Sequence, residues 1–156
     1  MDHYVKLCRK FLREATMNTL SCGDSTAAGV RAMINTDLRH LRVDRSDLNT
    51  EAVQSLIDLF FKNRSSDIKI VCSDEPVEDC SIVDMIFASW DNEKRNVALQ
   101  ENHKRVFRIN VDEEYEKEVL LKYWAANIFR STSEAPTKRI YVQVTGFCVL
   151  ATVWLV

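Results

Sequence analysis

The stretch from residue 40 to residue 63, HLRVDRSDLNTEAVQSLIDLFFKN, decides the fold of this chain. Leu41 and Val43 alternate with Arg42 and Asp44, which is the period-two pattern of a β-strand with one buried and one wet face. Apolar residues then recur at the spacing of one helix face, at Val53, Leu56, Ile57, Phe60 and Phe61. The stretch therefore predicts a strand followed by an amphipathic helix.

The sequence marks both ends of that helix. Asn49 is a good N-cap, because its side-chain oxygen can accept a free backbone N–H of the first turn. Leu48 and Val53 have the spacing of a hydrophobic staple. The polar run NRSSD at 63–67 is typical of a turn and predicts the end of the helix.

Looser copies of this strand-helix unit fill most of the chain. We expect strands at 17–24, 67–72, 105–112 and 138–144, and helices at 25–34, about 74–90 and 114–129. The second of these helices would begin at Asp74, Glu75 and Pro76, and the last would place Leu120 and Trp124 on its core side. Residues 130–137 read as a loop.

Length and composition fit one α/β domain spanning residues 1–156. With 46% hydrophobic residues a substantial core is expected, and 3 Gly and 2 Pro are too few for a barrel or sandwich with many tight turns. We expect an opening helix over 1–16, the strand-helix repeats over 17–144 and an apolar tail over 145–156. The opening helix is basic and amphipathic, so it either covers the end of the core or lies on a membrane or in a partner's groove.

The end of the chain, FCVLATVWLV at 147–156, is almost wholly apolar. It is too short to cross a bilayer, which takes about 20 apolar residues. Either it is a buried strand or it is a tail that docks on a partner. No membrane span is therefore expected.

The strands distinguish two arrangements of the sheet. Helices on both faces would require nearly continuous apolar strands, whereas helices on one face leave the other face wet. Arg42, Lys69 and Arg108 each sit between apolar neighbours, and burying them without partners would cost several kcal/mol. We therefore expect irregular leucine-rich-repeat-like strand-helix repeats in a mainly parallel sheet with helices on one face.

This arrangement predicts a partner-binding surface. Arg42, Lys69 and Arg108 would lie in register on adjacent strands, followed by Tyr141, and the next row would hold Asp44, Val71, Asn110 and Gln143. Arginine and tyrosine are enriched in interface hot spots, so this surface fits a protein partner with an acidic segment. The alternative is that such rows are solvated filler that keeps the sheet from aggregating.

Charge and cysteines bound the remaining possibilities. A net charge of -2 gives no expectation of nucleic-acid binding. The five cysteines form no C-x-x-C pair, which indicates free thiols rather than a disulfide framework or zinc site. A charged N-terminus does not resemble a signal peptide, so we expect an intracellular protein, cytoplasmic or nuclear.

Two enzyme interpretations remain open. The string Ser21-Cys22-Gly23-Asp24-Ser25 resembles the nucleophile block of a family of small esterases, and Asp37 and His40 imitate its acid-histidine pair. Asp24 and Ser25 are explained more simply as helix caps. Acids after the strands, including Asp112 and Glu113, could hold a divalent metal at the carboxyl edge of the sheet, but acids are ordinary in the first turn of a helix. No catalytic, metal or cofactor site is therefore assigned.

The succession LRHLRVDRSDLNTEAVQSLIDLFFKN, SSDIKIVCSDE and KRVFRINVDEE resembles the C-terminal regions of nematode F-box proteins over about residues 17–144. The resemblance implies an irregular leucine-rich-repeat-like module that recognises a protein target, in a ubiquitin-ligase adaptor. The opening segment shows no F-box pattern, so target binding is the part that applies here. We expect a non-catalytic protein-interaction module, with a small hydrolase acting at the carboxyl edge of the sheet as the alternative.

Overall fold

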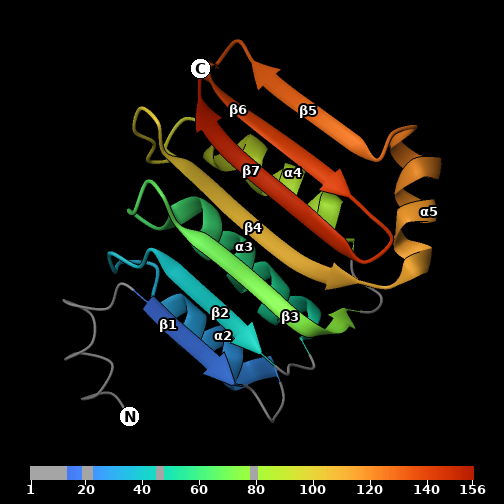
Figure 1. Ribbon diagram of the computed structural model, residues 1–156. Helices are drawn as coiled ribbons and strands as arrows, with labels where there is room; N and C mark the ends of the chain where they lie inside the picture. Colours follow the sequence, from blue (N-terminus) through green and yellow to red (C-terminus); the bar gives the residue numbers. More distant parts are fainter. Residues whose placement is uncertain (1–13, 19–22, 45–47, 78–80) are drawn as a thin grey trace.

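The structure is a computed structural model that describes residues 14–18, 23–44, 48–77 and 81–156. Within them the chain alternates strand and helix four times and closes on three strands (Figure 1). In chain order the elements are β1 (Glu14–Asn18), α2 (Gly23–Ala32), β2 (His40–Asp44), α3 (Thr50–Lys62), β3 (Lys69–Val77), α4 (Ile82–Glu93), β4 (Lys104–Val111), α5 (Glu113–Tyr123), β5 (Asn127–Thr132), β6 (Ala135–Val144) and β7 (Cys148–Leu155).

The described strands form one mixed sheet in the order β1-β2-β3-β4-β7-β6-β5. β1 to β4 are parallel neighbours in chain order, as expected when a helix crosses over between consecutive strands. β7 is antiparallel to both β4 and β6, and β5 is antiparallel to β6. The prediction of a mainly parallel sheet is therefore wrong for the C-terminal half, where β5–β6 and β6–β7 are hairpins whose connections are too short to hold a crossover helix.

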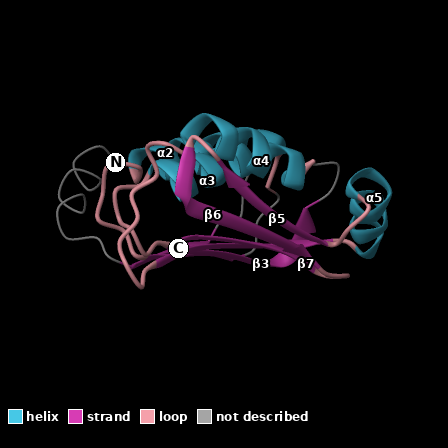
Figure 2. Cartoon of the chain, turned by 90° about the horizontal axis from the view of Figure 1, so that it is seen from above, coloured by secondary structure: helices cyan, strands magenta, loops and turns pink. Residues whose placement is uncertain are grey.

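Three helices cover one face of this sheet. Figure 2 shows α2, α3 and α4 in a layer on one side, while α5 stands beside one end of the strands. Among the described residues no helix lies on the opposite side. The expectation of a wet sheet face is met for this part of the chain.

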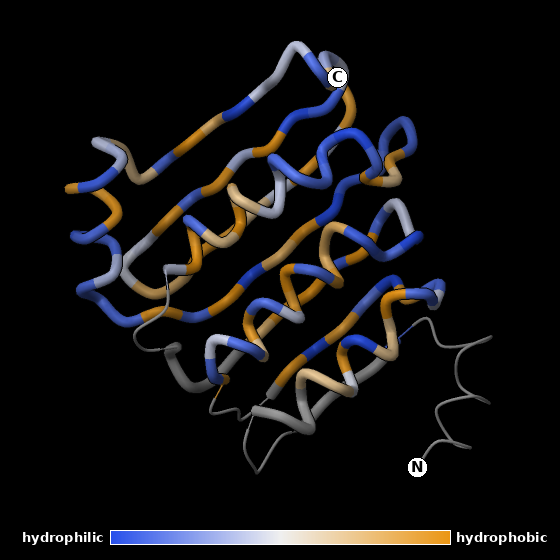
Figure 3. Tube along the Cα trace, turned by 180° about the vertical axis from the view of Figure 1, so that it is seen from behind, coloured by the Kyte–Doolittle hydropathy of each residue, from blue (hydrophilic) through white to orange (hydrophobic). Residues whose placement is uncertain are grey.

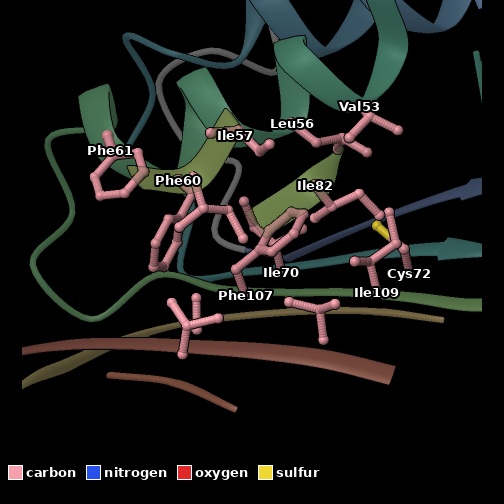
Figure 4. Packing of buried hydrophobic residues seen from close by; sticks show 14 of the residues in the cluster. Val53, Leu56, Ile57, Phe60, Phe61, Ile70, Cys72, Ile82, Phe107 and Ile109 are labelled. Carbon is pink, nitrogen blue, oxygen red and sulfur yellow. The ribbon is translucent and has the colours of Figure 1, made fainter. Parts of the chain in front are cut away.

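The core lies between the helix layer and the sheet. The predicted helix stripe from Val53 to Phe61 is fully buried, and Phe60 packs against Phe107 of β4 with ring centroids 5.7 Å apart (Figure 4). The backbone N–H of Ala52 donates to Asn49 Oδ1 at 2.8 Å, which confirms the N-cap. Figure 3, seen from the helix side, shows apolar and polar residues alternating along the strands, and this alternation separates the core from the wet face.

The N-terminal predictions are only partly met. Most of the predicted opening helix lies outside the described residues, but Glu14–Asn18 form a strand rather than the end of a helix. The strand predicted at 17–24 is therefore placed too late, and α2 already begins at Gly23. Parallel pairing with β2 accounts for the difference, because it gives the short polar segment EATMN backbone partners that its sequence does not signal.

The helix start predicted at Asp74, Glu75 and Pro76 is wrong. These residues belong to β3, and α4 begins at Ile82. β3 stays paired with β4 as far as Val77, across an irregularity after Cys72. Acids and proline favour the first turn of a helix only locally, and strand pairing overrides that preference here, with proline tolerated where the ladder is interrupted. The predicted stripe Val83, Ile86, Phe87 and Trp90 is nevertheless buried.

The segment after β4 differs most from the expectation. α5 ends at Tyr123, and Trp124 adopts a left-handed conformation with φ of 60° that stops the helix. Leu120 and Trp124 are exposed rather than in the core, and Val119 is the buried residue of α5. The predicted loop at 130–137 contains the turn of the β5–β6 hairpin. The helical spacing of apolar residues over 114–129 did not reveal that the helix ends at Tyr123 and that β5 begins at Asn127.

The apolar end of the chain is a central strand. β7 lies between β4 and β6 and pairs with both, so Val149, Ala151 and Val153 are buried against the helix layer. The interpretation as a buried strand is confirmed, and a tail that docks on a partner is wrong. Ten nearly continuous apolar residues fit this place because one face meets the core and both edges are paired.

Candidate interaction surface

The side of the sheet without described helices, which we call the open face, carries the predicted cations. Arg42, Lys69 and Arg108 are exposed, and their strand neighbours Leu41, Ile70 and Phe107 are buried on the other side. Within the described residues, Lys69 and Arg108 form no ion pair. The charges therefore point to water, as the alternation in the sequence predicts.

The register of the cations differs from the prediction. Arg42 and Arg108 do share a row, but Val71 lies between them, and Lys69 lies beside His40 and Val106 in the neighbouring row. The backbone N–H of Lys69 donates to the carbonyl of Arg39 at 2.7 Å, which sets β3 two residues away from the assumed alignment. A shift of two keeps every side chain on its face, so the alternation in the sequence could not reveal it.

The other predicted residues are distributed over the same face. Tyr141 aligns through Thr152 with Val106 in the row of Lys69, and Gln143 aligns through Leu150 with Arg108. Asn110 lies beyond these rows, opposite Cys148. Asp44 ends β2 and pairs with Asn18 of β1. The predicted residues share a sheet, but Asp44, Val71, Asn110 and Gln143 do not form one row.

Further open-face residues were not predicted. Lys104 is exposed at the start of β4 and pairs with Trp154, and Trp154 pairs with Arg139 on its other side. Val71, Val106 and Leu150 are partly exposed between the cations and β6. The open face therefore combines positive charge with apolar surface. Its partly exposed β7 residues were missed because the chain end was not aligned with any strand.

Three aromatic side chains gather on the open face over β5, β6 and β7. Phe129 and Trp154 come from the strands on either side of β6, and their ring centroids are 6.0 Å apart. Tyr141 pairs with Phe129 in the sheet, and its hydroxyl donates to Asn127 Oδ1 at 2.7 Å. Phe129 is still 56% exposed. We call Phe129, Tyr141 and Trp154 the aromatic cluster, and the sequence hid it because residues 114–129 were assigned to a helix.

A buried arginine lies on the opposite, helix-covered face. Arg105 is fully buried, and its guanidinium donates to the carbonyls of Ala98 at 2.9 Å, Phe60 at 2.7 Å and Asn63. Burial lowers the pKa of Arg105 to about 10, against the opposing effect of the Asp67 charge. The side chain therefore stays protonated at neutral pH and joins the end of α3 to the start of β4.

The junction of α4 and α5 holds a second polar group. Asp84 accepts hydrogen bonds from Lys122 Nζ at 2.5 Å and from the Tyr123 hydroxyl. Burial works to raise the pKa of Asp84, but these two hydrogen bonds and the positive charge of Lys122 together outweigh it and leave the pKa lowered. Burial and the bond to Asp84 raise the pKa of Tyr123, so the phenol remains a donor. The group borders a cleft of about 90 Å³ lined by Ser81, Val83, Asp84, Tyr115, Glu118, Val119, Lys122 and Tyr123.

The described residues do not bring together the side chains that either enzyme interpretation requires. Ser21 and Cys22 lie outside them, and Asp37 pairs with Arg64 at 2.8 Å. Asp112 caps α5 by accepting from the Tyr115 N–H at 3.0 Å, and the described residues contain no cluster of three potential metal ligands.

One serine-histidine contact does occur, at the opposite edge of the sheet from the predicted acids. Ser66 Oγ lies 2.6 Å from His103 Nδ1, joining the turn after α3 to the loop before β4. Among the described residues no carboxylate contacts His103, so the pair lacks the third member of a triad. Its evident role is to connect the two loops.

No helix in the described part of the chain is long and apolar enough to cross a membrane. Comparison of the chain with protein-family models, with curated proteins and with solved structures finds no match.

Proposed function

We propose that this protein is a non-catalytic protein-interaction module whose open face binds a partner through an acidic segment. The observation that carries the proposal is the exposure of Arg42, Lys69, Lys104 and Arg108 on one sheet face without a described helix over them. Opposite charge across an interface speeds association and selects partners. Target recognition is also the part of the resemblance to F-box-associated regions that applies to such a face.

The composition of the open face favours docking over solvated filler. A face selected only to prevent aggregation would carry charged and polar residues throughout. Here the apolar residues Val71, Val106 and Leu150 remain partly exposed beside the cations, and Phe129 is more than half exposed. Apolar surface rimmed by charge is typical of protein interfaces.

The proposal extends to the architecture and the setting of the module. We propose that β1–α2, β2–α3 and β3–α4 are irregular leucine-rich-repeat-like units, because each adds one parallel strand beside the last with its helix on the same side. We also propose an intracellular setting, which the free thiols of Cys72 and Cys148 support.

The test is a pull-down with an Arg42→Glu/Arg108→Glu variant of the full chain, with bound proteins identified by mass spectrometry. Both changes lie on the open face and lower the net charge by four, two for each reversal. We expect the acidic partners retained by the wild type to be lost, because like charges then face each other. Binding by the wild type should also weaken as salt rises.

The matched control is Arg31→Glu/Arg64→Glu, which makes the same change in net charge away from the open face. Both arginines are exposed and paired with acids at the surface, so little stability is lost. The control should retain the partners. An open-face variant that still retains every partner of the wild type would show that this face is not the docking surface.

A further inference from the structure

The open face is divided into two halves with different chemistry. The half over β2, β3 and β4 carries the exposed cations Arg42, Lys69, Lys104 and Arg108. The half over β7, β6 and β5 carries the aromatic cluster together with Leu150, Thr152, Gln143 and Asn127. Among the open-face residues that pair between β5, β6 and β7, the charged one is Arg139. Its guanidinium donates to the carbonyls of Pro136 and Lys138 on its own strand.

The boundary between the two halves runs parallel to the strands, so a path across the strands passes from one half to the other. One row runs from Lys69 through Val106, Thr152 and Tyr141 to Phe129. The neighbouring row runs from Arg42 through Val71, Arg108 and Leu150 to Gln143. A ligand that contacts both halves therefore crosses the strands, and partly exposed apolar side chains lie under its path.

From this arrangement we infer that the ligand of the open face is a two-part peptide segment. Its acidic side chains lie over β2 to β4, and an aromatic or large aliphatic side chain packs against Phe129 and Trp154. The inference rests on the proposed function and names the partner chemistry of the same surface. It assigns the aromatic cluster as the specificity-determining half, since charge attracts many acidic segments whereas a ring contact selects among them.

Strand spacing sets the pattern of the segment. Neighbouring strands lie about 4.8 Å apart, so β4 and β6 are about 10 Å apart, as are β2 and β4. An extended peptide rises about 3.3 Å per residue and covers that distance in about three residues. The segment therefore has acidic residues about three positions apart and an apolar anchor about three to four positions beyond.

A single-stranded nucleic acid fits this face less well. Such a ligand carries phosphate along its whole length and is held by cations that follow the backbone. Here the exposed cations Arg42, Lys69, Lys104 and Arg108 all lie on one half of the open face. The rings of Phe129 and Trp154 are tilted by 52° toward each other, which uses part of their faces for mutual contact rather than for stacking on bases. The distribution of charge favours a ligand that is acidic at one end.

The experiment selects ligands from a random dodecapeptide library displayed on phage, with the full chain as bait. The wild type should enrich peptides in which acidic residues precede or follow a Trp, Phe or Leu at about the spacing above. The Phe129→Ala variant should enrich acidic peptides without that anchor. Trp124→Ala is the matched control, because Trp124 is an exposed aromatic residue that lies outside the open face, at the end of α5.

Affinities of an enriched peptide, measured by fluorescence anisotropy, give the second readout. Phe129→Ala should weaken binding roughly tenfold, and Trp124→Ala should leave it nearly unchanged. Replacing the peptide's own anchor with Ala should weaken binding to the wild type similarly, with little further effect on the Phe129→Ala variant. This non-additivity shows that the two aromatic groups contact each other.

The outcomes separate this inference from the proposed function. If Phe129→Ala enriches the same anchored peptides with the same affinity, the aromatic cluster is not part of the site. The proposed function then stands, provided Arg42→Glu/Arg108→Glu abolishes peptide binding. If oligouridine binds the wild type more tightly than any enriched peptide, both proposals are wrong.

Discussion

Arg105 shows how one side chain joins separate parts of the molecule. Its three acceptors are backbone carbonyls at the end of α3 and in the loop before β4, so one guanidinium satisfies groups that the fold buries far apart in sequence. Asn63 acts similarly, since its amide donates to the carbonyls of Met33 and Thr36 after α2. Buried polar groups of this kind are costly when left without partners.

Replacing Arg105 with Met should lower the free energy of unfolding by about 3 kcal/mol or more, because three carbonyls lose their donor in the core. Urea denaturation measures this loss. Arg108→Met on the same strand is the control, and its exposed position predicts a change within about 0.5 kcal/mol. Equal stability of the two variants would contradict the role given to Arg105.

Among the helices, α3 and α5 differ most in how much apolar surface they bury against the rest of the protein. α3 buries a continuous stripe under the centre of the sheet and has a side-chain cap. α5 buries Val119 and depends on polar contacts, including the Tyr115 hydroxyl that accepts the Val83 N–H at 3.0 Å at the start of α4. Leu121 is 82% exposed and Trp124 91% exposed. Buried apolar area therefore holds α3, whereas α5 is held by Val119, by its partly buried tyrosine rings and by a few hydrogen bonds.

The cap of α3 can be tested by Asn49→Ala. Loss of the acceptor for the Ala52 N–H should cost about 1 kcal/mol in the free energy of unfolding, measured in urea. Asn49→Ser should retain most of that stability, since serine is also a good N-cap. A serine variant as unstable as the alanine variant would show that another feature of Asn49 matters.

Removing the Tyr123 hydroxyl should loosen α5 without unfolding the core. In Tyr123→Phe, amide hydrogen exchange in α5 should rise roughly fivefold, since one hydrogen bond is worth about 1 kcal/mol, while exchange in α3 stays unchanged. Lowering the pH should also loosen α5. Because the pKa of Asp84 is lowered in the folded state, its contribution is present above the ordinary carboxylate pKa and is lost as pH falls through the folded value.

Exchange at neutral pH and an acid titration of the Val119 methyl signals would measure both effects. Leu121→Ala is the control, because its side chain is exposed on α5 and is not part of the lining of the cleft that Asp84 borders. An equal rise of exchange in α3 would mean that the hydroxyl supports the whole fold instead.

At the scale of the molecule, the chain end holds the two halves of the sheet together. β7 connects the parallel strands β1 to β4 with the β5–β6 hairpin. On the open face, its residues Leu150 and Thr152 lie between the cations of β2 to β4 and the side chains of β6. Deleting residues 148–156 should abolish the cooperative unfolding transition in urea, because β4 and β6 both lose their neighbour. Deleting only Val156, which is exposed and makes one backbone bond to Thr137, should leave the transition nearly unchanged.

The sequence alone determined the local features of this protein. Period-two alternation placed Arg42, Lys69 and Arg108 in water and Leu41, Ile70 and Phe107 in the core, because burying a cation is costly unless, as for Arg105, the core supplies acceptors for its hydrogen bonds. Helical spacing and a capping residue identified α3. The apolar stripe Val83, Ile86, Phe87 and Trp90 identified α4.

Tertiary structure alone decided what these elements meet. The two-residue offset of Lys69, the extension of β3 through Pro76, the strand at Asn127–Thr132 and the central place of β7 all depend on hydrogen bonds between strands distant in sequence. Such bonds leave no periodic signal in either partner. The open face could therefore be predicted from its alternating residues, whereas the aromatic cluster on it could be found only once β5, β6 and β7 were seen side by side.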